Sequence, residues 1–157
     1  MRSERPVLPS ILDRLIDLEP KLREDAAVSR AQSIREIKAS LQRDLEWLLN
    51  TRRLAGELPE SAEELIHSLY YYGLPEFGDL SLSAAADVLS KYMEAAIRTF
   101  EPRLANVRVI MRPVEGVARI AHFIIEGVLL IDPLPERVAF DTVFELAKGE
   151  YRVRGES

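Results

Sequence analysis

The sequence has no cysteine, which excludes disulfide bonds and thiolate metal sites and fits a reducing compartment. It has two histidines, His67 and His122, and neither has the spacing of metal ligands. Positive charge is also scarce, because 21 Lys and Arg residues stand against 26 Asp and Glu residues and the net charge is −5. No basic cluster outweighs its acidic neighbours, so we expect no nucleic-acid partner.

Long apolar runs are missing too. The longest such stretch, residues 120–131, is interrupted by His122, Glu126 and Gly127, and a membrane helix needs about 18 or more apolar residues. The N-terminus leads into no apolar segment of the kind found in secretion signals. Phosphate-binding loops, dinucleotide fingerprints and nucleophile motifs are also absent. We therefore expect a cytoplasmic protein that inserts into no membrane and uses no cofactor and no metal.

The length and composition predict one folded domain. The chain has 157 residues, of which 47% are hydrophobic, enough for a substantial core. We place this domain at residues 30–157 and an N-terminal arm at residues 1–29. The arm contains an amphipathic stretch at residues 10–18 that is too short to be a stable helix alone. It is expected to dock either on its own core or on a neighbouring protein.

Helical periodicity dominates the first two thirds of the chain. Residues 30–53 carry a continuous apolar stripe, and Trp47 lies well off it, covering a second layer or facing a partner. Ser61 to Glu64 reads as a capping box that begins a short helix running to Leu69. A third helix is expected over residues 84–100. The stripe of the first helix consists of Ile34, Ile37, Leu41, Leu45 and Leu48.

After residue 102 the apolar period changes to that of β-strands. Strands are expected at residues 107–112, 120–131 and 138–146, with a possible fourth at 151–154. The short turns favour an antiparallel meander, so the fold class is α+β, with N-terminal helices packed on a small C-terminal antiparallel sheet of three to four strands. Few edge-blocking features are visible apart from Arg108 and Arg112. The sheet is therefore a candidate for completion by strands of another chain, at residues 107–111 or 138–146.

The junction between helices and strands is Glu101-Pro102-Arg103. Pro102 disfavours helical backbone at Glu101, so the third helix should end there. The acid and the base at this junction have two interpretations. One is a local ion pair at an exposed helix end, worth at most about 1 kcal/mol. The other is a rigid polar contact for a partner.

Carboxylates are the remaining candidates for chemistry. A glycosidase needs only two of them, one of which acts as an acid. Asp44, Glu46 and Glu63 lie in helical runs, where a solvated or ion-paired role is the default, and Glu76 and Glu101 complete the candidate set. We expect none of them to be catalytic.

Several motifs, taken together and in order, resemble the TssE family, the sheath-initiator subunits of type VI secretion baseplates, and the related small wedge proteins of contractile phage baseplates. The most specific is Phe100-Glu101-Pro102-Arg103-Leu104, directly after a helix. The others are residues 10–15, residues 41–52, Tyr72-Gly73-Leu74-Pro75 and residues 123–129. Together they cover nearly the whole chain.

This resemblance implies a structural, non-enzymatic role, although the family has been called lysozyme-like. It implies that Glu101, Pro102 and Arg103 bind the wedge subunits TssF and TssG, with TssK as a possible further partner. It also implies that the sheet seeds the sheath built from TssB and TssC, in a cytoplasmic baseplate docked at the inner membrane through other subunits. A peptidoglycan hydrolase and the equivalent part of a phage-derived injection particle are the alternatives.

Overall fold

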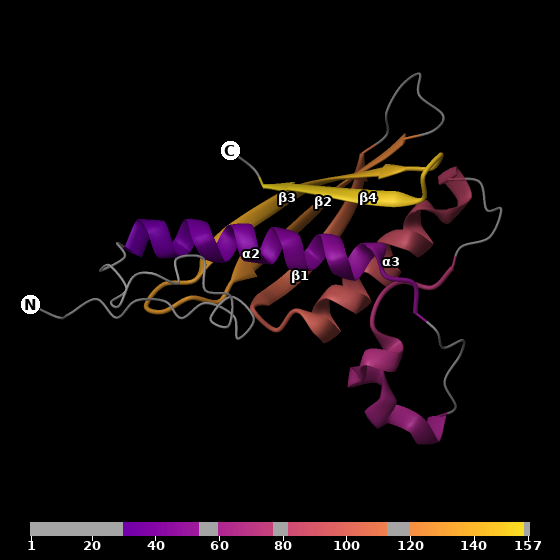
Figure 1. Cartoon of the computed structure of the whole chain (residues 1–157), viewed down its shortest axis with the longest axis horizontal. Coiled ribbons are helices and arrows are strands. Elements are labelled where there is room, and N and C mark those ends of the chain that lie inside the picture. Colours follow the sequence, from indigo (N-terminus) through magenta and orange to yellow (C-terminus); the bar gives the residue numbers. More distant parts are fainter. Residues whose placement is uncertain (1–29, 54–59, 77–81, 113–119, 156–157) are drawn as a thin grey trace, which may run out of the picture.

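A computed structural model describes residues 30–53, 60–76, 82–112 and 120–155. It contains a four-stranded antiparallel sheet in the order β1-β2-β3-β4, which confirms the predicted α+β meander (Figure 1). The N-terminal arm lies outside the described residues. The strands are β1 (Leu104–Arg112), β2 (Ile120–Leu129), β3 (Glu136–Glu145) and β4 (Glu150–Gly155).

The fourth strand changes which strands lie at the edges of the sheet. β3 pairs with β2 along its full length and with β4 from Phe140 to Glu145. The edge strands are therefore β1 and β4, and the expectation that residues 138–146 offer an edge is wrong for residues 140–145, which β4 covers. The reason is that residues 150–155 continue the alternation of buried and exposed side chains for long enough to form a strand of their own.

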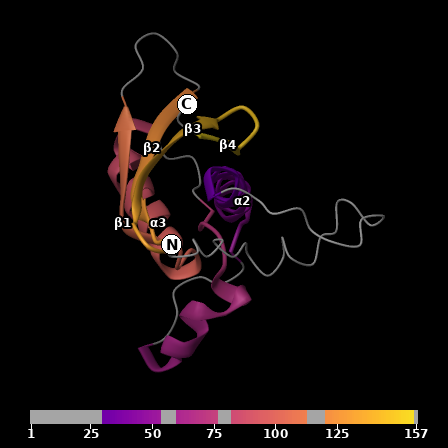
Figure 2. The ribbon, with the colours of Figure 1, turned by 90° about the vertical axis from the view of Figure 1, so that its left-hand side faces the viewer.

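Two helices pack against one face of this sheet. α2 (Arg30–Asn50) lies against β4, and α3 (Leu82–Phe100) lies against β1 (Figures 1 and 2). In β1, the apolar side chains of Val107 and Val109 are buried in the core, while Arg108, Ile110 and Arg112 alternate outward. Within the described residues, no helix is long and apolar enough to cross a membrane.

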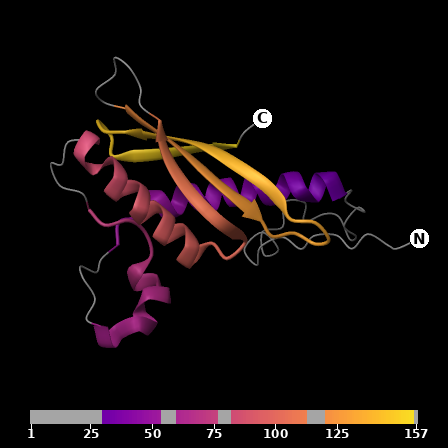
Figure 3. The ribbon, with the colours of Figure 1, turned by 180° about the vertical axis from the view of Figure 1, so that it is seen from behind.

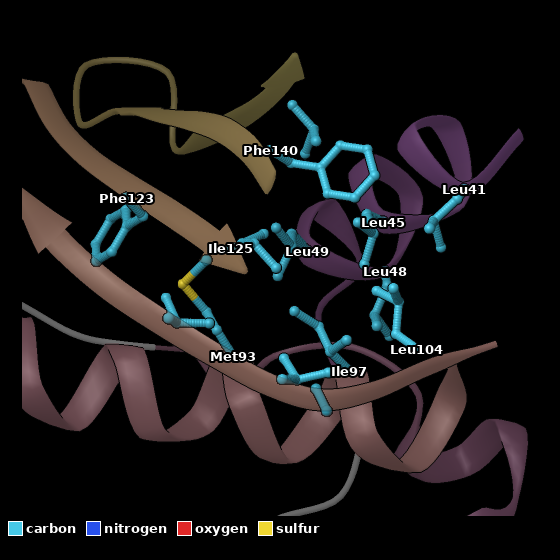
Figure 4. Packing of buried hydrophobic residues seen from close by; sticks show 14 of the residues in the cluster. Leu41, Leu45, Leu48, Leu49, Met93, Ile97, Leu104, Phe123, Ile125 and Phe140 are labelled. Atoms are coloured by element: carbon cyan, nitrogen blue, oxygen red, sulfur yellow. The ribbon is translucent and has the colours of Figure 1, made fainter. Parts of the chain in front are cut away.

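The core lies between the helices and the sheet. The predicted α2 stripe is buried at Ile37, Leu41, Leu45 and Leu48, and Ile34 is partly buried against the same cluster. Figure 4 shows side chains of both helices and the sheet converging on one apolar interior. The largest fully buried side chains include Phe123, Phe140, Leu41, Leu45, Leu49, Met93, Ile97 and Ile125.

The segment after α2 differs from its prediction. Instead of one α-helix from residue 61 to 69, it forms two 3-10 helices, η1 (Glu60–His67) and η2 (Leu69–Tyr71), which project away from the sheet (Figures 1 and 3). Leu65, Leu69 and Tyr70 are exposed, so no apolar face is buried that would stabilise a regular helix. The Ser68 hydroxyl donates a hydrogen bond to the Leu65 carbonyl (2.7 Å) between the two short helices. The side chains of residues 60–63, which include Ser61 of the expected capping box, are outside the described part.

Candidate functional site

The site begins where α3 ends, at Phe100, as the position of Pro102 predicts. The amide of Glu101 still donates to the Ile97 carbonyl (2.8 Å), and the amide of Leu104 donates to the Glu101 carbonyl (3.1 Å). Pro102 therefore occupies the second position of a turn, where its fixed φ is favourable. Pro102 is exposed, whereas Glu101 is only 6% exposed.

Arg103 closes this turn onto Glu101 through two parallel hydrogen bonds. Its Nε donates to Oε1 and its Nη2 to Oε2, both at 2.6 Å. A planar guanidinium matches a carboxylate in this way, which makes such pairs stronger than single-contact ion pairs. The predicted local ion pair is present, but the idea of exposed charges at a helix end is wrong because the Glu101 carboxylate is buried.

α2 provides the other side of the site. Arg103 Nη2 also donates to Asp44 Oδ2 (2.6 Å), and Nη1 donates to Ser40 Oγ (3.2 Å). Asp44 Oδ1 accepts from Arg43 Nη2 (3.1 Å). A continuous polar network thus joins the turn to one flank of α2, where Ser40 and Asp44 are one helical turn apart.

The network reaches the surface at Trp47. The Arg43 guanidinium lies 5.1 Å from the centroid of the Trp47 ring, within the range of a cation–π contact. Trp47 is 51% exposed, so it covers no second layer formed by the described residues. The structure favours the outward-facing interpretation, and what Trp47 contacts stays a prediction.

Charge and burial shift two pKa values here. Hydrogen bonding to Glu101 raises the pKa of Arg103, although partial burial opposes the shift, and the charge of Asp44 adds to it. Burial raises the pKa of Tyr72, and the negative charges of Asp44 and Glu101 raise it further. Arg103 is therefore a permanent cation between two carboxylates, and Tyr72 is held as a neutral phenol beside them.

Tyr72 is held in this position by backbone hydrogen bonds between residues 51–53, at the end of α2, and Leu74, which we call the backbone clip. The amide of Leu74 donates to the Thr51 carbonyl (2.9 Å), and the amide of Arg53 donates to the Leu74 carbonyl (3.0 Å). Gly73 has φ +104°, and a Cβ on it would lie 2.3 Å from the Thr51 oxygen. Only glycine permits this close approach. Tyr72 then packs edge-to-face on Phe100, with ring centroids 5.1 Å apart.

A second set of contacts lies at the β4 edge of the sheet, and sequence reasoning missed it. The side-chain amide of Asn50 pairs with the backbone of Tyr151 as a peptide group would. Its Nδ2 donates to the Tyr151 carbonyl (2.8 Å), and its Oδ1 accepts from the Tyr151 backbone N–H (2.7 Å). Gln42 donates to the Val153 carbonyl (2.9 Å), and Glu46 accepts from the Val153 amide (3.0 Å). We call these the α2 edge contacts.

The β1 edge has an equivalent set, the α3 edge contacts. Glu94 accepts from the Val109 amide (2.9 Å), and Arg98 donates to the Val107 carbonyl (2.9 Å). The expectation of few edge-blocking features is therefore wrong. Polar residues four apart on each helix were the available signal, but the sequence does not show which strand they would face.

The predicted carboxylates have separate structural positions. Asp44 binds Arg103, Glu46 binds the β4 backbone and Glu76 is exposed, while the side chain of Glu63 is outside the described part. Asp44 and Glu101 are brought together, yet both accept hydrogen bonds from the same guanidinium.

Residues 35–134, from α2 to the turn after β2, match the model of a family described as baseplate wedge protein gp25. The protein is therefore a component of a contractile-machine baseplate, of the phage wedge or type VI secretion kind. The chain belongs to the baseplate wedge protein gp25 family, which includes TssE. A comparison with individually curated proteins gave no match.

Proposed function

We propose that this protein is the non-enzymatic wedge subunit of a type VI secretion baseplate, which binds the other wedge subunits and initiates polymerisation of the contractile sheath. TssF and TssG are the proposed wedge partners, TssK is a possible further contact, and TssB and TssC are the proposed sheath partners. The location that follows is a cytoplasmic baseplate docked at the inner membrane by other subunits.

The single observation that carries the wedge contact is the construction of the 101–103 turn. Its backbone is fixed by Pro102, and its side chains are fixed by hydrogen bonds to Asp44 and Ser40 on another helix. A partner that binds here meets a preorganised surface and does not have to order it, which saves binding free energy. The exposed part of the turn is Pro102 with the outer side of Arg103, so these groups would make the contact and Glu101 would support them.

The same geometry supports a structural role over a hydrolytic one. A glycosidase requires one carboxyl group as a proton donor and a second within about 5–10 Å. Asp44 and Glu101 share Arg103, and each already accepts a hydrogen bond of 2.6 Å from it. Their oxygens are engaged in holding the turn together.

The wedge contact is tested by co-purification of TssF and TssG with Pro102→Asp. This change adds a charge at an exposed turn position, and the hydrogen bonds of Arg103 to Glu101 and Asp44 still hold the turn, so folding should be retained and wedge binding lost. Pro135→Asp is the matched control, since Pro135 is also an exposed proline, in the connection between β2 and β3. Wedge binding retained by Pro102→Asp at wild-type level would contradict the assignment.

Sheath initiation is tested in cells with a fluorescent sheath subunit. Pro102→Asp should abolish sheath fluorescence because no wedge forms, and Pro135→Asp should not.

Release of muropeptides from peptidoglycan by the purified wild-type protein would instead support the hydrolase. Genome neighbourhood would separate a secretion system from a phage-derived particle.

A further inference from the structure

The α2 edge contacts reproduce the spacing of a β-strand. Four residues of an α-helix advance about 6 Å along its axis, and two residues of a strand advance about 6.6 Å. Glu46 and Asn50, four apart on α2, meet Val153 and Tyr151, which are two apart on β4, and Gln42, one turn earlier, reaches the carbonyl of the same Val153. These three side chains therefore stand where the backbone of a fifth strand would lie.

The backbone of a partner strand could replace these three side chains at little cost in free energy. Gln42 and Glu46 are partly exposed and Asn50 is exposed, so all three would return to water if another group replaced them. The strand amides and carbonyls would then pair with the replacing backbone, and no buried polar group would be left unsatisfied. The exchange therefore leaves no buried hydrogen-bonding group unpaired, either on the three helix side chains or on the β4 backbone.

Space for an extended segment is present beside β4. A groove of about 720 Å³ is lined by Gln42, Glu46, Asn50 and residues 149–154. It is continued along α2 by a hollow of about 410 Å³ that Gln42 also lines, together with Arg35 and the end of β4 at Gly155. The groove thus runs beside both the edge strand and the helix that caps it.

Glu46 and Glu150 line this groove together with Arg152 and Arg154, but two of the three exposed side chains on the outer face of β4 are basic, which favours an acidic partner there. Arg152 and Arg154 are exposed on β4, at the positions that alternate with buried Tyr151 and Val153. The carboxylate that pairs with Arg152 is Glu145, at 3.8 Å. Acidic side chains on an added strand would lie directly beside these arginines, and such cross-strand pairs of opposite charge are stabilising.

We propose that β4 is the strand-accepting edge of this protein, and that Gln42, Glu46 and Asn50 occupy it until an extended segment with acidic residues at alternate positions replaces them. The inference rests on the proposed function, in which that segment belongs to the sheath. The α2 edge contacts then have two consequences. They keep the lone protein from associating edge to edge, and they restrict strand addition to partners that can displace them.

The test uses the full chain and a short fluorescent peptide of alternating valine and glutamate. The triple variant Gln42→Ala, Glu46→Ala and Asn50→Ala should bind this peptide about tenfold more tightly than wild type, a factor that corresponds to about 1.4 kcal/mol. A peptide of alternating valine and lysine should gain nothing. The matched control is Glu94→Ala with Arg98→Ala, which frees the β1 edge and should leave the affinity unchanged.

Two N-methylated peptides identify the mode of binding without altering the protein. Methyl groups on alternate amides block one side of an extended chain. If the peptide adds as a strand, one of the two methylation registers should abolish binding and the other should retain it. Equal binding of both registers, tighter binding by the β1-edge variant, or no gain in the triple variant would each overturn the proposal.

The outcomes remain separable from those of the proposed function. Peptide binding at β4 together with a failure of sheath initiation in cells would contradict the sheath role and leave the strand-accepting edge in place. If the triple variant showed no gain in peptide affinity while the protein still seeded sheath, the strand-accepting edge would be contradicted and the sheath role would stand. A dimer of the triple variant that excludes the peptide would show that a second copy is the occupant, and would also overturn the proposal.

Discussion

Glu101 and Arg103 form their bidentate pair where one partner is almost fully buried and the other is partly exposed. The Glu101 side chain is 8% exposed and that of Arg103 is 25% exposed. Removing one partner from such a pair costs more than removing a surface ion pair, because the remaining charge keeps its desolvation penalty. The pair therefore holds the α3–β1 junction together as well as shaping the surface around Pro102.

We expect Glu101→Ala to reduce the free energy of unfolding by about 2–3 kcal/mol. The estimate is at the low end for a buried pair because Arg103 retains Asp44 and some contact with water. Urea denaturation followed by circular dichroism measures it. Glu64→Ala, at an exposed position of η1, should change the same quantity by less than about 0.5 kcal/mol. A loss for Glu101→Ala as small as that of the control would mean that the pair adds nothing to stability.

Tyr151 predicts a pH dependence at the alkaline end. Burial raises the pKa of its phenol to about 12 from 10.0, so the folded protein binds this proton more tightly than the unfolded chain does. The resulting stabilisation is complete below pH 10 and is lost as the pH rises toward 12. Between pH 9 and pH 11 wild type should lose about 1 kcal/mol more than Tyr151→Phe, as measured by urea denaturation. Equal losses in the two proteins would refute the assignment.

At the scale of elements, the end of α2 is fixed by backbone contacts rather than by propensity. α2 ends at Asn50, three residues before its predicted end, because the Thr51 and Arg53 backbones pair with Leu74. This clip requires the positive φ and the missing side chain of Gly73. It ties the helix to the segment that carries Tyr72.

Gly73→Ala should therefore destabilise the protein by more than about 2 kcal/mol, since strain at φ +104° adds to the collision with the Thr51 oxygen. Gly149→Ala is a matched control. Gly149 also has a positive φ (+66°), but the nearest atom to its added Cβ is the end of the Arg52 side chain at 3.8 Å. Gly149→Ala should reduce the free energy of unfolding only by the cost of a left-handed backbone with a side chain, about 1 kcal/mol. Thermal unfolding of the two variants compares them, and equal losses would show that the close approach is not tight.

The sequence predicted the elements whose information is local. The stripe of Leu41, Leu45 and Leu48, the stop at Pro102 and the alternation of β1 all follow from short-range patterns. Contacts between distant segments could not be predicted in this way. Asp44 and Glu101 are far apart in sequence, and neither position shows that Arg103 joins them. The edge contacts were missed for the same reason, and with them the protection of both edges.

At the scale of the whole molecule, α2 joins the two surfaces proposed to bind partners. One flank, with Ser40 and Asp44, holds the 101–103 turn, and the other, with Gln42 and Glu46, holds β4. Residues two apart on a helix point in nearly opposite directions. The wedge contact and the strand-accepting edge therefore lie on different sides of one element, and variants of either surface can be made without touching the other.

The α2 edge contacts also bear on how the chain folds as it is made. They join residues that are 101 to 111 positions apart, from the first described helix to the last described strand. During synthesis, α2 leaves the ribosome long before β4 exists, and until then β3 is the open edge of a three-stranded sheet. Contacts between such distant segments form late and slow the completion of a fold. The emerging chain thus passes through a stage in which both the edge of β3 and the polar side chains of α2 lack their partner. That partner is the same six-residue strand, Glu150–Gly155.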